Sequence, residues 1–200
     1  WLNTGTTPSS ISLSDTSSSG GDLMYNTAGS LTTNANTNFS TASGAVILQA
    51  NNNLTYGPTP LSLGAGQALN LAAGGNMTIN NSINIANPIA LTAGGTLTAN
   101  AAVTSTGSTL SINAGTLNVT GGSMWGDAGL SVVAGTTNIG SVSLGSNSGD
   151  VNLITDTLNM NNGGINASSG SINIFATNMT LNNYSSISAG TDLNVIALQD

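Results

Sequence analysis

Seven aspartates carry nearly all of the chemistry that this chain could do near neutral pH, because it contains no Lys, Arg, His, Glu or Cys. General acid–base catalysis needs a side chain that exchanges a proton, and the carboxyl group is the one available here. Serines are numerous, but none has a His or Lys to activate it as a nucleophile. The aspartates are Asp15, Asp22, Asp127, Asp150, Asp156, Asp192 and Asp200.

Two of these aspartates occupy equivalent places in a repeating pattern. Asp150 and Asp192 each stand one residue before an apolar segment, two repeats apart, and Asp22 stands at the same place much earlier. Equivalent residues two rungs apart in a stack of strands are separated by ~9.6 Å, near the upper end of the carboxylate separation in inverting glycosidases. An Asp that follows Gly or Thr at a corner also caps the backbone there, and this structural role is the one we expect.

Asp127 follows Trp125 and Gly126 in a stretch that reads as a loop, where it belongs either to an exposed contact patch or to a turn. We expect the turn role. The chain has no P-loop, dinucleotide-binding fingerprint or histidine metal motif, and its glycines do not follow the calcium-binding nonapeptide. The sequence therefore predicts no catalytic, cofactor-binding or metal-binding residue, and no cofactor.

The composition excludes several classes of partner. The net charge is −7 although only 4% of residues are charged, and without Lys or Arg nothing can neutralise phosphates. Nucleic acid and anionic membrane surfaces are therefore excluded as partners. The absence of Cys excludes a disulfide framework, and no apolar run reaches the length of a membrane-spanning helix. Trp1 begins directly on polar sequence with no signal peptide, as expected for a mature product or an internal piece of a longer protein.

Short apolar–polar–apolar clusters recur every 20 to 23 residues. A second cluster follows the first seven or eight residues later, and a third, looser one completes each period. This alternation predicts strands of about three to five residues with one buried face. The first clusters open at Leu23, Val46, Leu69, Ile89, Leu110, Leu130, Val151, Ile172 and Leu193.

Small residues separate the first cluster from the second, as in Ala73-Gly74-Gly75 and Ala93-Gly94-Gly95. Gly and Ala are typical of corners, so each period is interpreted as a triangular coil of three strands. The sequence AGGT at 93–96 becomes AGT at 114–116, which predicts that this corner loses one residue.

Coils of this kind must stack, because one coil cannot bury its apolar face alone. The predicted fold is all-β: a right-handed parallel β-helix, or β-solenoid, of about eight coils over residues 23–200. Residues 1–22 form an irregular leading segment or a partial coil. Neither a transmembrane barrel, with its longer strands, nor an antiparallel sandwich explains the period. One shared core is expected for Leu69, Leu71, Met77, Ile79, Ile83 and Ile85.

The outward positions also repeat and predict ladders of like residues that hydrogen-bond from rung to rung. A charge in such a column would repel its copy in the next coil, which agrees with the low charged fraction. The first column is Asn70, Ala90, Ser111, Ser131, Asn152, Asn173 and Asn194. The second is Thr32, Thr55, Thr78, Thr98, Asn118, Asn138, Asn159 and Thr180.

Phrases such as GGNMTINNSINI, AGTLNVTGG, SGDVNLITDTLNMNNGGINASSGSINI and SAGTDLNVIA resemble the repeats of bacterial two-partner-secreted exoproteins of the filamentous haemagglutinin type. The resemblance covers residues 45–200. It implies a right-handed parallel β-helix, export across the outer membrane and a role as an adhesin or surface filament. The chain departs from the family in lacking basic residues and a recognisable N-terminal secretion domain, and no catalytic or binding residue of the family matches a position here.

We therefore expect a non-enzymatic extracellular shaft or filament segment at the bacterial cell surface. The alternative is an adhesin module that binds host or carbohydrate surfaces. A polysaccharide-acting β-helix enzyme is the weaker alternative, since a β-elimination lyase would need a basic group. Residues 193–200 begin a coil without a cap, so we expect the stack to continue into more chain or to self-associate into filaments. Nucleic-acid binding and membrane insertion are not expected.

Trypsin should not cleave this chain even after denaturation, because its specificity pocket requires Lys or Arg and the sequence has neither. Mass spectrometry of the purified, denatured chain after digestion should show the intact mass alone. A reproducible tryptic ladder would contradict the prediction, and a protease that cuts after aromatic or Leu residues serves as the positive control.

Overall fold

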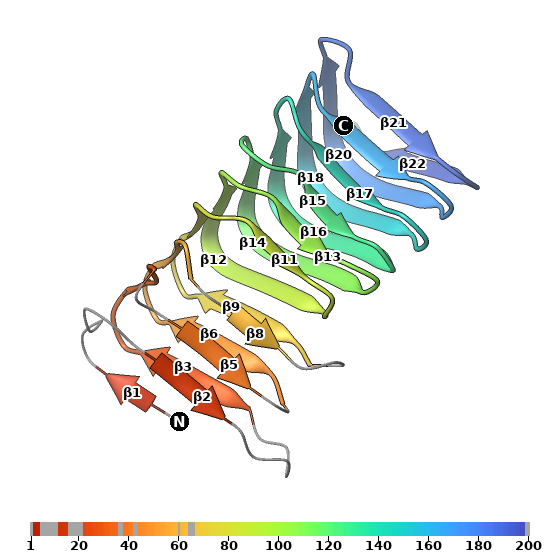
Figure 1. Cartoon of the computed structure of the whole chain (residues 1–200). Helices are drawn as coiled ribbons and strands as arrows, with labels where there is room; N and C mark the ends of the chain where they lie inside the picture. Colours follow the sequence, from red (N-terminus) through yellow and green to blue (C-terminus); the bar gives the residue numbers. More distant parts are fainter. Residues whose placement is uncertain are drawn as a thin grey trace.

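The computed structural model describes residues 2–4, 12–15, 22–35, 38–41, 44–59, 61–63 and 67–198. Every regular element in this part of the chain is a β-strand, and the strands stack along one axis from β1 to β22. Figure 1 shows the N-terminal and C-terminal coils at opposite ends of the stack. The predicted fold class is confirmed: the chain is a parallel β-solenoid of about eight turns.

The largest sheet has 13 strands and forms two sides of the coil. Its first side is continuous from β1 to β22, and the short strands β4, β7 and β10 belong to the second side. The strands are β1 (Leu2–Thr4), β3 (Leu23–Thr27), β4 (Leu31–Thr32), β6 (Val46–Ala50), β7 (Leu54–Tyr56), β9 (Leu69–Ala73), β10 (Met77–Ile79), β12 (Ile89–Ala99), β14 (Thr109–Val119), β16 (Gly129–Ile139), β18 (Val151–Asn161), β20 (Ile172–Asn182) and β22 (Leu193–Ala197).

The third side of the coil is formed by two smaller sheets. The first contains β2 (Ser12–Asp15), β5 (Asn38–Thr41) and β8 (Leu61–Leu63). The second contains β11 (Ile83–Ile85), β13 (Val103–Ser105), β15 (Met124–Gly126), β17 (Ser143–Ser146), β19 (Gly164–Ala167) and β21 (Ser186–Ala189). The sequence did not predict this division. It falls between β8 and β11, where a hollow of about 130 Å³ lies beside Tyr56.

Each strand pairs in parallel with its equivalent one coil further on. On the first side, Ile89 is paired with Leu110, Leu110 with Leu130, and Leu130 with Val151. β1 pairs with β3 and β2 with β5 in the same parallel manner, so the stack includes strands that precede residue 23. Because equivalent residues lie one rung apart, each position of the repeat forms a column along the axis.

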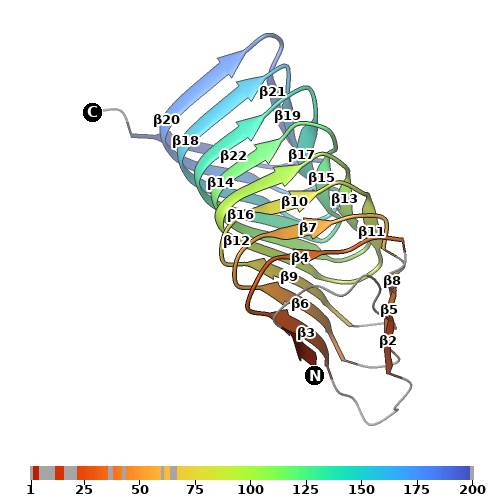
Figure 2. The same ribbon diagram turned by 90° about the vertical axis from the view of Figure 1, so that its left-hand side faces the viewer.

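The predicted strand length of about three to five residues is wrong for β12, β14, β16, β18 and β20. The first two strands of the coil are fused there into single strands of 11 residues, which Figure 2 shows side by side. Ala93-Gly94-Gly95 is therefore a bend within a paired strand. A Cβ on Gly94 would lie 2.2 Å from the Gly74 carbonyl oxygen, so glycine lets the stacked backbones approach closely at the bend. The predicted loss of one residue is confirmed, because the register shifts between Ala93 and Thr96.

The inward-facing columns form one continuous apolar core. Leu69, Leu71, Met77 and Ile79 are at most 1% exposed and Ile83 is 2% exposed, as predicted, whereas Ile85 is only partly buried. Full burial of such side chains stabilises the fold by about 1.5–3 kcal/mol each. Each coil contributes to a core that it shares with both of its neighbours.

Asparagine ladders connect the coils on the outside, as predicted. Asn138 donates to Asn118 over 2.7 Å, and Asn159 donates to Asn138 over 2.9 Å. On the first side, Asn173 donates to Asn152 and Asn194 to Asn173, both over 2.9 Å. In each pair the Nδ2 group donates to the Oδ1 atom one coil earlier, so a single residue type satisfies both its donor and its acceptor along the column.

Tyr56 makes the stability of the fold depend on pH in the alkaline range. Its side chain is 2% exposed, and its hydroxyl group donates to the Thr59 carbonyl oxygen over 3.3 Å. Burial raises the pKa of Tyr56 from 10.0 to about 12. The folded state therefore holds the phenol proton more tightly than the unfolded state does. This contribution to stability is complete below pH 10 and is lost as the pH rises toward 12, by up to about 2–3 kcal/mol.

We predict that the free energy of unfolding, measured with urea, falls between pH 10 and pH 12 and that Tyr56→Phe reduces this fall. Tyr184→Phe is the matched control, because Tyr184 is 97% exposed, and it should retain the alkaline loss. An alkaline loss of equal size in Tyr56→Phe and in the original chain would show that this phenol is not its source.

Candidate functional site

Two of the aspartates that could do chemistry bind backbone amides of the following coil. The Ala45 amide donates to Asp22 Oδ1 over 2.8 Å, and the Ser171 amide donates to Asp150 Oδ1 over the same distance. Both aspartates directly precede a first-side strand, and the amide that each accepts precedes the equivalent strand one coil later. The carboxylates therefore cap the corner, as expected, but through a bond to the next coil and not through the local backbone bonds that the sequence predicted.

Asparagine side chains make the same bond at the start of the second side. The Asn76 amide donates to Asn53 Oδ1 over 2.9 Å, and the Thr96 amide donates to Asn76 Oδ1 over 2.8 Å. Sequence reasoning missed this role. A sequence signal for this capping role exists, because Asn, Asp or Ser stands one residue before many of the apolar clusters.

Asp127 is a turn residue that connects three coils. Its Oδ2 atom accepts the Gly107 amide over 2.9 Å, and its Oδ1 atom accepts the Asn147 side-chain amide over 2.6 Å. Its backbone carbonyl also accepts the Ser148 hydroxyl over 2.9 Å. The sequence interpretation as a turn agrees with this geometry, whereas Trp125 and Gly126 lie in strand β15 and not in a loop.

Asp150 and Asp192 lie two coils apart at the same corner, with Ser171 between them. The Val151 amide donates to the Ser171 carbonyl and the Ile172 amide donates to the Asp192 carbonyl, both over 2.9 Å. A surface hollow of about 370 Å³ borders Asp150, where Gly129 has no side chain. This hollow has one carboxylate in its lining, and that carboxylate already accepts the Ser171 amide. The arrangement supports a capping role for Asp150.

The described residues contain no group of three or more His, Cys, Asp or Glu side chains that could hold a metal ion. Within the same residues, no helix is long and apolar enough to cross a membrane.

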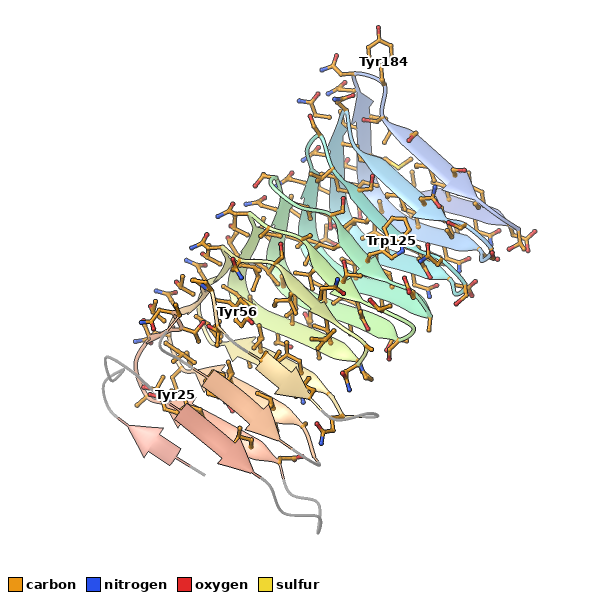
Figure 3. The ribbon with its side chains drawn as sticks, viewed as in Figure 1. Tyr25, Tyr56, Trp125 and Tyr184 are labelled. Carbon is orange, nitrogen blue, oxygen red and sulfur yellow. The ribbon has the colours of Figure 1, made fainter. Side chains whose placement is uncertain are left out.

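Two aromatic side chains on the outside depart from the repeat. Trp125 is half-buried and lies over Gly145, its partner in the next coil, whose added Cβ would be 2.2 Å from the indole ring. Tyr184 is 97% exposed and has a φ of 58°. Figure 3 shows Tyr184 pointing away from the corner between β20 and β21. A positive φ is uncommon for a bulky residue, so this ring is held outward on a backbone that few residues adopt.

Comparison of the chain with protein-family models, with curated proteins and with solved structures found no match.

We predict that Asp127→Ala destabilises the fold by about 0.5–1.5 kcal/mol, because it removes the carboxylate that accepts the exposed Gly107 and Asn147 donors. Urea unfolding followed by circular dichroism measures the change. Asp156→Ala is the matched control: it removes the same charge from an exposed position and should change stability by less than about 0.5 kcal/mol. Equal effects of the two substitutions would show that the charge, and not the bonding at the corner, decides stability.

Proposed function

We propose that this chain is a non-enzymatic structural shaft of a bacterial cell-surface filament, of the filamentous haemagglutinin type that its repeats resemble. The observation that carries the proposal is the unbroken parallel register of the first side from β1 to β22. Each coil is joined to the coils before and after it by parallel strand pairing and by shared core columns, and Asn ladders join several of the coils. A chain built in this way extends in one direction as coils are added.

The parallel register accounts for the length and the stiffness that a shaft needs. Each coil adds ~4.8 Å to the length of the rod, the distance between paired strands. Bending the rod would stretch the inter-coil bonds on one side, and the Asn ladders and the capping aspartates add further bonds between the same coils. Continuation of the stack, by more of the same chain or by another copy, forms part of this proposal.

A non-enzymatic role is supported by what the carboxylates do. Asp22, Asp127 and Asp150 each accept backbone or side-chain amides of neighbouring coils, which is a structural use of the groups that could exchange protons. An extracellular location is supported by the composition: a chain without Lys or Arg offers no site to trypsin-like proteases, and it has no thiol to oxidise.

An adhesin module is the second candidate, and Tyr184 favours it. Tyrosine is enriched at binding hot spots, because its ring offers a large contact area at a low entropic cost. Tyr184 is almost fully exposed at a corner of asparagine and serine residues, which is the composition of an adaptable polar contact surface. The ligand in this case would be a host-surface or carbohydrate receptor.

The two candidates predict different results for the purified chain. A shaft should appear in electron micrographs as straight rods whose length increases by ~4.8 Å per coil when coils are duplicated, and it should bind no sugar on a glycan array. An adhesin should bind a defined set of glycans, and Tyr184→Ser should abolish that binding while the fold is retained.

Thr106→Ser is the matched control for the glycan array, because it changes an exposed residue at a different corner. Rods that collapse or shorten when coils are duplicated would contradict the shaft. Glycan binding lost in Tyr184→Ser and kept in Thr106→Ser would replace the shaft with the adhesin.

A further inference from the structure

One outward-facing column of the first side changes from polar to apolar along the rod. From Asn26 onward, its members each lie three residues after the apolar residue that opens the first cluster of a coil, and they are paired with one another through successive coils. Before Val133 this column is Asn3, Asn26, Gln49, Ala72, Thr92 and Asn113, of which all except Ala72 are polar. In the next four coils it is Val133, Ile154, Phe175 and Ile196, and we refer to these four residues as the apolar ridge.

Three of the ridge residues, Val133, Ile154 and Phe175, are exposed because they face outward, whereas Ile196 lies in the last described coil, where Leu193 and Val195 are exposed too. Val133, Ile154 and Phe175 lie in coils that are covered on both sides, yet they are 43%, 53% and 46% exposed. Each of their immediate neighbours in the strand faces the core, as Leu153 and Thr155 do on either side of Ile154. Large apolar side chains in one contiguous exposed column indicate an interaction surface.

A groove runs beside the ridge at the bend of the long strands. It has a volume of about 400 Å³ and is lined by the small residues Ala134, Gly135 and Ala176. The ridge residues Val133, Ile154 and Phe175 line this groove, together with Asp156, Thr177 and Leu198. The groove therefore lies next to the ridge over the three coils that these residues belong to.

The column on the other side of the ridge remains polar. It contains Asn152, Asn173 and Asn194, which are hydrogen-bonded to one another. The apolar surface is thus about one residue wide and four rungs long. An occupant must contact a narrow line of side chains that repeats at the inter-strand distance.

We propose that the ridge is the contact surface for a second copy of this chain, with two solenoids lying side by side so that the ridge of each enters the groove of the other. A ridge next to a groove is self-complementary under two-fold symmetry. The ridge residues repeat every ~4.8 Å, and a second solenoid presents its own ridge at the same interval. All four rungs can therefore be in contact at once.

Other occupants match this spacing less well. Along an extended peptide, side chains on one face repeat every ~6.6–6.8 Å, and along a helix the turns repeat every ~5.4 Å. Over the three intervals between four rungs, the last contact is displaced by about 6 Å for an extended peptide and by about 2 Å for a helix. Pairing of two copies through the ridge does not depend on the proposed role as a shaft, because an adhesin or an enzyme with this ridge would also pair.

Asp156 distinguishes a second copy from a cationic partner. It is the only charged residue in the lining of the groove, and the chain has no cation with which a second copy could neutralise it. Pairing of two copies places like charges near each other, so Asp156→Asn and added salt should both strengthen it. A basic partner would be bound more weakly after either change.

Sedimentation equilibrium over a range of protein concentrations tests the pair. The surface is small beside a standard interface of about 800 Å² per partner, so we expect a reversible dimer at high protein concentration. The double variant Ile154→Thr/Phe175→Thr should raise the dissociation constant about tenfold or more, because each replaced side chain occurs twice in the pair. Thr occurs naturally in this column at Thr92, so the substitutions suit an outward strand position.

Asn113→Thr is the matched control, one coil before the ridge, and should leave the dissociation constant unchanged. Circular dichroism and thermal unfolding show whether each variant remains folded. Because the chain has no Cys, a single Ile154→Cys substitution also reports the contact directly: oxidation should give a disulfide-linked dimer, whereas Ser141→Cys at an exposed corner should not.

Three results would overturn the proposal. They are equal association of the original chain and the folded double variant, weaker association of Asp156→Asn, and equally fast cross-linking at positions 154 and 141. Each is independent of rod length and glycan binding, so a failure of the pair can be distinguished from a failure of the proposed function.

Discussion

The ladder of parallel backbone hydrogen bonds between each strand and its equivalent strand one coil later is the interaction on which the rest of this structure depends. It fixes a separation of ~4.8 Å between equivalent positions, so the residue at each position must be compatible with the equivalent residues in the neighbouring coils. An inward column must be apolar in coil after coil, as from Ile89 through Leu110 and Leu130 to Val151. An outward column favours residues that can bond their own copies, which Asn does and a charged side chain does not.

The same constraint accounts for where the few carboxylates are placed. Asp150 and Asp192 occupy one column, but Ser171 lies between them and separates the charges by two rungs. Asp127 is bracketed by Gly107 and Asn147, which donate to it. Asp22, Asp127 and Asp150 lie at corners, where amides of a neighbouring coil donate to their carboxylates. This use explains how a chain with a net charge of −7 and no cation can stack closely.

A uniform stack is well suited to length and stiffness and offers few places for specific recognition. The informative places are those where one coil differs from the next: the Trp125 ring over Gly145, the outward Tyr184, and the column that becomes apolar at Val133. None of these departures is needed to maintain the register. They are therefore the surfaces on which a shaft, an adhesin or a laterally paired rod would differ.

The sequence by itself determined the period, the parallel stacking, the core columns, the Asn ladders and the lost residue at the bend, because all of these follow from spacing along the chain. It did not determine that the first two strands fuse from β12 onward, since Gly-rich bends and true corners have the same composition. Nor did it reveal the inter-coil caps of Asp22 and Asp150, which need the distance between coils. Alternation along the strand also places Ile154 on the outer face with Asn152, but only the tertiary structure showed that Val133, Ile154, Phe175 and Ile196 form one exposed column, because this needs the pairing of each strand with its neighbours.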